Sequence, residues 1–188
     1  MNPPTDAIVD LLTYIGEDPT RDGLLDTPAR VCKAMREMTA GYHLDPAVIL
    51  SKTFDVDHDD MIVLAGINYW SLCEHHMLPF HGQATVGYIP KKGARIVGLS
   101  KLARLVDCYA KRLQVQERMT NQIATAIETH LDPAGVGVVI TGHHSCMQAR
   151  GIQAAGTMIT SCMTGVLHND SAARAEFLSI SHARPSLG

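Results

Sequence analysis

Two short windows of the chain combine cysteine and histidine at spacings that suit a metal ion. They are Cys73-Glu74-His75-His76 and His143-His144-Ser145-Cys146. In a Cys-x-x-His window, both side chains can turn toward one ion from a tight loop. In the second window, an extended chain would point His144 and Cys146 to the same side. Each window follows an apolar, strand-like segment, so the two together predict one metal site built from distant parts of the sequence.

The predicted metal ligands are two cysteines and one histidine: Cys73, His76 and Cys146. Three protein ligands leave one coordination position open, which is the arrangement of catalytic zinc, whose bound water can reach a pKa of about 7. A structural zinc would need a fourth ligand, but the remaining cysteines lie in apolar segments that favour core packing: Cys32, Cys108 and Cys162. We therefore predict one Zn²⁺ per subunit, with Fe(II) as the alternative that the same ligands would suit.

Two further histidines, His75 and His144, neighbour the predicted ligands without belonging to them. Imidazole gains and loses a proton near neutral pH, so both side chains are candidates for acid–base catalysis beside the metal. Their presence favours an enzyme over a purely structural metal site.

The composition is that of a single folded domain. The 188 residues are 46% hydrophobic and 19% charged, a balance that excludes a disordered chain. No apolar run approaches the roughly 18 residues of a membrane span, and the first residues lack the basic start and apolar stretch of a signal peptide. The five cysteines are an odd number, so they cannot form a complete disulfide framework. We expect a cytoplasmic protein.

Charge is distributed unevenly along the chain. The formal net charge of −3 argues against partners such as nucleic acid or an anionic membrane, which attract basic proteins. Residues 91–118, however, contain eight basic and two acidic residues. A basic segment within an acidic chain predicts a local site for an anion.

The elements that must position these residues follow an α+β order. Helical spacing predicts helices over five segments: 6–15, 27–41, 100–113, 116–130 and a short one from 171. Strand patterns lie at 61–72, 80–89, 94–99, 135–141 and 156–164, with a hairpin turn at 91–93. Thr27 and Ser100 are the expected N-caps of their helices. We predict an α+β protein with an antiparallel sheet, divided into an N-terminal helical arm, 1–58, and a catalytic core, 59–188.

Three long motifs give the chain a family resemblance. They are CEHHMLPFHGQATVGYIP from residue 73, GLSKLARLVDCYAKRLQVQERMT from residue 98 and HHSCMQARG from residue 143, and together they resemble GTP cyclohydrolase I of the folate pathway. The resemblance is colinear from about Thr27 to Phe177. It implies the tunnelling fold, an antiparallel four-stranded sheet with two helices on one face. It also implies hydrolysis of GTP to formate and 7,8-dihydroneopterin triphosphate, in a homodecamer of two pentamers with active sites at subunit boundaries.

The resemblance also assigns roles by position. The metal ligands and the two acid–base histidines coincide with those proposed above. Glu117 matches the carboxylate that holds guanine, whose N1–H and N2–H donors suit its two oxygens. Gln116, beside it, is a further predicted substrate contact. The residues that match contacts to the ribose and phosphates are Ser100, Lys101, Arg104, Arg150 and Arg30.

Two other classes of protein stay open at this point. A related tunnelling-fold enzyme could act on another pterin or a deazapurine, but a nitrile reductase of that kind needs a nucleophilic cysteine and a nicotinamide site, and no glycine-rich dinucleotide motif is visible. A non-catalytic, zinc- and GTP-binding assembly protein would have a closed metal site with four ligands. The free histidines beside the predicted metal argue against this second class.

Overall fold

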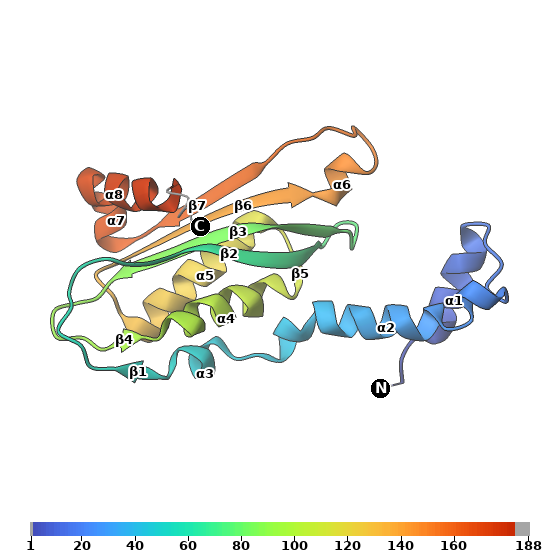
Figure 1. Ribbon diagram of the computed structural model, residues 1–188, viewed down its shortest axis with the longest axis horizontal. Coiled ribbons are helices and arrows are strands. Elements are labelled where there is room, and N and C mark those ends of the chain that lie inside the picture. The colour runs from blue at the N-terminus through green and yellow to red at the C-terminus, as the bar shows by residue number, and fades with distance from the viewer. Residues whose placement is uncertain (1, 183–188) are drawn as a thin grey trace, which may run out of the picture.

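A computed structural model describes residues 2–182 of the chain, and an antiparallel sheet lies at its centre (Figure 1). Four long strands form this sheet: β2 (Ile62–Cys73), β3 (Pro79–Ile89), β6 (Gly135–His144) and β7 (Met158–Met163). A two-residue strand, β5 (Leu113–Gln114), pairs in parallel with β2, so the strand order is β5-β2-β3-β6-β7. β3 is therefore hydrogen-bonded on both sides, to β2 and to β6.

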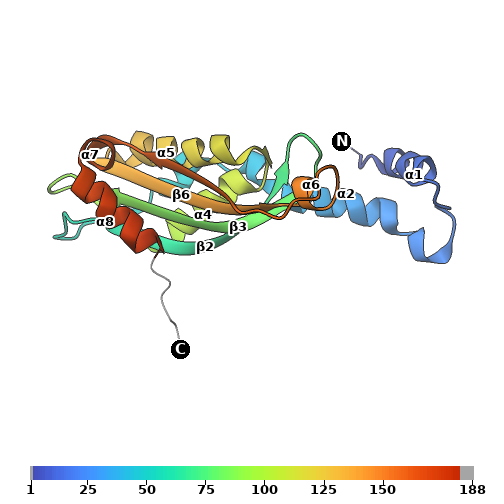
Figure 2. The same ribbon diagram turned by 90° about the horizontal axis from the view of Figure 1, so that it is seen from above.

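Two helices cover one face of the sheet, α4 (Leu99–Ala110) and α5 (Gln116–Leu131), as Figures 1 and 2 show. Val86 of β3 and Leu105 of α4 are both fully buried in the core between the sheet and these helices. The β3 residues of this core are Phe80, Ala84, Val86 and Tyr88, which are spaced by two or four positions and therefore share the face that lies against the helices. This arrangement confirms the α+β prediction and the sheet-and-two-helix layout that the resemblance implied.

The opposite face of the sheet is covered at one end, by α7 (Gly165–Asn169) and α8 (Ser171–His182) (Figure 1). Phe177 of α8 is fully buried above Gly87 and Gly137, which are register partners on β3 and β6. A Cβ atom added at Gly137 would lie 2.7 Å from the Phe177 ring. The two glycines thus leave the space in which this ring packs on the sheet.

The N-terminal helices extend away from the sheet (Figure 1). They are α1 (Thr5–Tyr14), the 3₁₀ helix η1 (Asp22–Leu24) and α2 (Thr27–Met38). The chain then returns along the core through η2 (Ala40–His43), α3 (Pro46–Leu50) and β1 (Thr53–Phe54). Leu50 is buried in the main core, ahead of the predicted boundary at residue 58. The division into an arm, 1–58, and a core, 59–188, stays a prediction. The last six residues of the core lie outside the described ones.

The predicted hairpin after β3 is wrong. The segment contains only a short strand, β4 (Ile96–Val97), which pairs with β1 in a separate two-stranded sheet. Both edges of β3 are already occupied, so no edge is left for a hairpin partner. The Tyr88 hydroxyl of β3 instead accepts a hydrogen bond of 3.0 Å from the Val97 N–H.

Two predicted N-caps and one predicted helix end also differ from the structure. Thr27 is the first residue of α2, and Asp26 occupies the cap position. Gly98 precedes α4, so Ser100 lies within the first turn of that helix. α4 ends three residues before Leu113, because that residue joins β5 and pairs with β2. Within residues 2–182, no helix is long and apolar enough to cross a membrane.

The substitution Gly137→Ala is expected to destabilise the fold, because the new methyl group would meet the buried Phe177 ring at 2.7 Å. Overpacking of this kind costs about 1–3 kcal/mol. Gly156→Ala is the matched control, since its methyl group would meet only the flexible end of Met147, at 3.4 Å. Urea unfolding at one protein concentration should show a lowered midpoint for Gly137→Ala alone. Equal midpoints for the two variants would contradict this packing.

Candidate active site

The ends of β2 and β6 lie at the same end of the sheet, on either side of β3. Phe80, near the start of β3, is the register partner of Ser71 on one side and of His144 on the other. Cys73 is the last residue of β2, and His144 is the last residue of β6. The antiparallel pairing therefore brings together the two cysteine- and histidine-containing windows, although they are far apart in the sequence.

Two tight turns then aim the ligand side chains at one point. The turn after β2 is closed at Cys73, whose N–H donates to the Leu78 carbonyl and whose carbonyl accepts from the Met77 N–H, both at 2.8 Å. After β6 the chain forms α6 (Ser145–Gln148), a single helical turn. The chain is therefore not extended through the second window, and the condition under which alternation would align His144 with Cys146 is not met. The helical turn, and not strand alternation, carries Cys146 to the β2–β3 turn.

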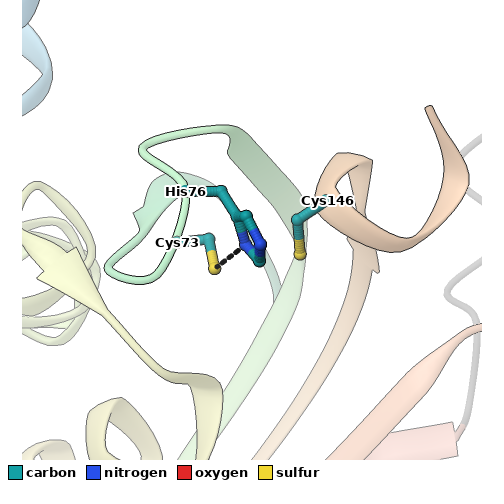
Figure 3. Close-up of side chains that lie close together, drawn as sticks. All are labelled: Cys73, His76 and Cys146. Carbon is teal, nitrogen blue, oxygen red and sulfur yellow. Dashed lines mark hydrogen bonds between the residues drawn. The ribbon is translucent and has the colours of Figure 1, made fainter. Parts of the chain in front are cut away.

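Cys73, His76 and Cys146 converge at the end of the sheet (Figure 3). Their ligand atoms all lie within 4.8 Å of one another, and no other group of three cysteine, histidine or acidic side chains in residues 2–182 does so. Cys73 Sγ is 3.9 Å from His76 Nδ1, close to the roughly 3.6 Å between a sulfur and a nitrogen ligand of tetrahedral zinc. Cys73 is buried and His76 is exposed, so the group is open to solvent on one side. Donor types and spacing both fit Zn²⁺.

The remaining cysteines lie apart from this group, as predicted. Cys108 is fully buried in α4, whereas Cys32 and Cys162 are half-buried in α2 and β7. Burial, with a smaller contribution from the adjacent Cys73, raises the pKa of the Cys146 thiol. A bound cation would favour the thiolate form of both sulfurs and so offset this effect.

A charged pair beside the metal group was missed by the sequence analysis. Glu74, next to Cys73, forms an ion pair with Arg118 of α5, and the hydrogen bond from Arg118 lowers the pKa of the Glu74 carboxyl. The Glu74 N–H also donates to the Gln114 carbonyl at 3.0 Å, and Arg118 Nε donates to the Gln114 side chain at 3.1 Å. These bonds tie the β2–β3 turn to β5 and α5. The opposite charges of Glu74 and Arg118, each inside one of the three family motifs, are the sequence feature from which this ion pair could have been predicted.

The two histidines predicted as acid–base groups occupy different surroundings. The His144 ring stacks on Phe80, with centroids 4.5 Å apart and planes 8° apart. Burial lowers the pKa of His144, and the nearby carboxylate of Glu117 partly opposes that shift. Glu117 itself is exposed in the first turn of α5. His75 has 66% of its side chain exposed, and its Nε2 lies 3.9 Å from a carboxylate oxygen of Glu74.

Two further predicted residues lie next to these groups. Arg150 Nη1 is 3.4 Å from His76 Nε2, so the guanidinium reaches the metal group. Gln116 is only 1% exposed, and its side-chain amide is bonded to the interior of the protein and to His144. The structure therefore brings Arg150 and Gln116 to the site, but Gln116 faces inward.

The other predicted phosphate-binding residues lie elsewhere in this chain. Ser100, Lys101 and Arg104 occupy the first half of α4. At 1.5 Å per residue, Ser100 is about 15 Å from the end of α4 that leads to β5 and the metal group. Arg30 lies on α2, outside the core, where it pairs with Asp26 at 2.9 Å. One chain alone does not bring these four residues to the cysteines and histidines.

Comparison with known protein families decides the relationship. The family model described as GTP cyclohydrolase I matches residues 5–182, almost the whole chain. The chain belongs to the GTP cyclohydrolase I family. The match covers both windows, α4 and α5, so every predicted site residue of this family member lies inside it.

Curated relatives extend this result. GTP cyclohydrolase 1 of Mycobacteroides abscessus is 51% identical over 175 residues, which cover 93% of this chain and 86% of that protein. The enzymes of the same name from Mycobacterium ulcerans and Mycobacterium marinum are also 51% identical, with 87% of each covered. Among solved structures, the apo form of an archaeosine synthase, QueF-Like, aligns with a TM-score of 0.42 and 18% identity, over 54% of this chain and 91% of that one.

In this GTP cyclohydrolase I family member, Cys146→Ser is expected to lose the metal, because two ligands would remain. The loss of affinity should exceed the roughly 10- to 100-fold effect of removing an outer-shell partner. Cys162→Ser is the matched control, since Cys162 is a half-buried cysteine outside the group. His144→Ala should also keep its metal. Elemental analysis of the three purified proteins measures this, and full metal retention by Cys146→Ser would remove Cys146 from the ligand set.

Proposed function

We propose that this chain hydrolyses GTP to formate and 7,8-dihydroneopterin triphosphate. The observation that carries the proposal is the convergence of Cys73, His76 and Cys146 beside His144 and Glu117, in a chain that belongs to the GTP cyclohydrolase I family. Relatives at 51% identity bear the name of this enzyme. Both cysteines near the site are needed for the metal group, which leaves no nucleophilic cysteine for a nitrile reductase.

The ligand set proposed for Zn²⁺ is Cys73, His76 and Cys146. When bound there, Zn²⁺ supplies Lewis acidity and lowers the pKa of a water molecule. Arg150, next to His76, adds a positive charge on the exposed side of the group, where it can attract a phosphate of GTP. Elemental analysis of protein purified without added metal distinguishes Zn²⁺ from Fe(II).

Glu117 is the proposed guanine anchor. Its carboxylate is exposed in the first turn of α5, close enough to influence His144, so guanine bound to it would lie beside that imidazole. Two oxygens accept from the paired N1–H and N2–H of guanine, and adenine lacks this pair of donors. The carboxylate would thus set both the choice of base and the position of the imidazole ring of GTP.

His144 and His75 are the proposed proton carriers. With guanine on Glu117, His144 can accept a proton from the water that adds to C8 and pass it on to N7, which lets the imidazole ring open. Both C8–N bonds break in the course of the reaction, and C8 leaves as formate. The exposed His75 is available to move protons to and from water. The ribose carbons then rearrange and close a new ring on the freed amine, so that one water is consumed in the net reaction.

We propose that each active site is completed by a second copy of the chain. The support is that, within one chain, the metal group lies apart both from the cations on α4 and from Arg30 on α2. Lys101, Arg104 and Arg30 from a neighbouring subunit would supply the charge that a triphosphate requires. The homodecamer of two pentamers, the absence of nucleic-acid and membrane partners and the cytoplasmic location stay predictions.

Incubation of the metal-loaded protein with GTP is the direct test of the activity. We expect formate and, after oxidation of the product, neopterin fluorescence, with no consumption of NADPH. The same sample should contain stoichiometric zinc. Absence of both products from metal-loaded protein would refute the proposed function, and NADPH oxidation with a deazapurine nitrile would favour the reductase.

Mixing two inactive variants tests the shared site. Cys146→Ser removes a metal ligand and Lys101→Ala removes a phosphate contact, so each variant alone should be nearly inactive. If one subunit supplies the metal group and its neighbour supplies Lys101, subunit exchange should restore up to about a quarter of wild-type activity, because that fraction of interfaces receives both intact halves. Lys111→Ala is the control that should stay active, because Lys111 is the C-cap residue of α4 and pairs with Asp107. No recovery from a verified mixed oligomer would contradict the shared site.

A further inference from the structure

Gln116 is a buried amide whose nitrogen is surrounded by acceptors. It is the first residue of α5 and is 1% exposed. Its Nε2 donates toward the carbonyl of Ile140 at 3.1 Å, the carbonyl of Met158 at 3.2 Å and the hydroxyl of Thr160 at 3.1 Å. Two carbonyl oxygens can only accept, so the nitrogen end of the amide must face β6 and β7.

The hydroxyl partners fix the same orientation independently. Thr120 Oγ1 donates its hydrogen to the main-chain carbonyl of Gln116 at 2.7 Å, because a carbonyl can only accept. In the 2.7 Å contact between the two hydroxyls, Thr160 must therefore be the donor to Thr120. With its hydrogen used, Thr160 can only accept from Gln116. The amide oxygen consequently points the other way, toward His144.

This oxygen determines which nitrogen of His144 carries hydrogen. Gln116 Oε1 lies 3.0 Å from His144 Nε2, and an amide oxygen only accepts, so Nε2 must be protonated. Gly142 makes the approach possible, because a Cβ atom there would lie 2.2 Å from the same oxygen. The Phe80 ring, stacked 4.5 Å from the imidazole, holds its plane.

We infer that Gln116 is a positioning residue that holds His144 as the Nε2–H tautomer and leaves Nδ1 as the ring nitrogen available to the substrate. This inference rests on the proposed function for its catalytic consequence, but not for the position of the hydrogen. It argues against the prediction that Gln116 contacts the substrate, because both ends of its amide are already bonded within the protein.

Steady-state kinetics separate the two roles. Gln116→Met keeps the length of the buried side chain but removes the acceptor for His144. A positioning role predicts that kcat falls roughly 10- to 100-fold, part of what general acid–base catalysis contributes, while KM for GTP stays within about twofold. A guanine contact predicts the opposite, a raised KM with kcat retained, and that result would overturn the inference. Thr160→Val, which removes one partner of the amide but leaves His144 untouched, is the control and should keep most of its kcat.

Neutron diffraction of the wild-type protein tests the tautomer without any variant, so it serves even if Gln116→Met does not fold. We expect deuterium on His144 Nε2, directed at Gln116 Oε1, and none on Nδ1. Deuterium on Nδ1 with a bare Nε2 would overturn the inference. Because this measurement needs no turnover, it distinguishes failure of the positioning role from failure of the proposed function.

Discussion

The double pairing of β3 is the constraint on which the site depends. Because β3 is bonded to β2 on one edge and to β6 on the other, Phe80 has Ser71 and His144 as neighbours. A slip of one residue in the pairing of β6 with β3 would turn the side chains of β6 to the opposite faces of the sheet. His144 would then lose both its stacking on Phe80 and its bond to Gln116. The register thus decides whether the two windows form one site.

Around this end of the sheet, polar bonds do what apolar packing cannot. Apolar contacts hold α5 against the sheet but do not direct a hydrogen atom. The amide of Gln116 links α5 to β6 and β7, and the ion pair of Glu74 with Arg118 links α5 to the β2–β3 turn. The helix therefore connects the β2–β3 turn to the strand that leads into α6. A site built this way combines an inward, fixed His144 with an outward, solvated His75.

Short-range patterns in the sequence were enough to predict the long strands, α4, α5 and the ligand set of the β2–β3 turn, since those depend on alternation and on Cys-x-x-His spacing. Features that depend on distant partners were not predictable in this way. β4 pairs with β1 because β3 has no free edge, and five-residue helices such as α3 and α7 leave too few positions for a periodic pattern. The role of Gln116 rests on acceptors of β6 and β7. A lone glutamine gives no sign of them.

The proposed chemistry requires that Cys73, His76 and Cys146 together hold one metal ion at the junction of the two turns. Zinc X-ray absorption spectroscopy of the loaded protein measures this most directly. We expect two sulfur neighbours at about 2.3 Å and one imidazole nitrogen at about 2.0–2.1 Å, with the remaining neighbour a light atom. A first shell with one sulfur, or with three, would contradict it.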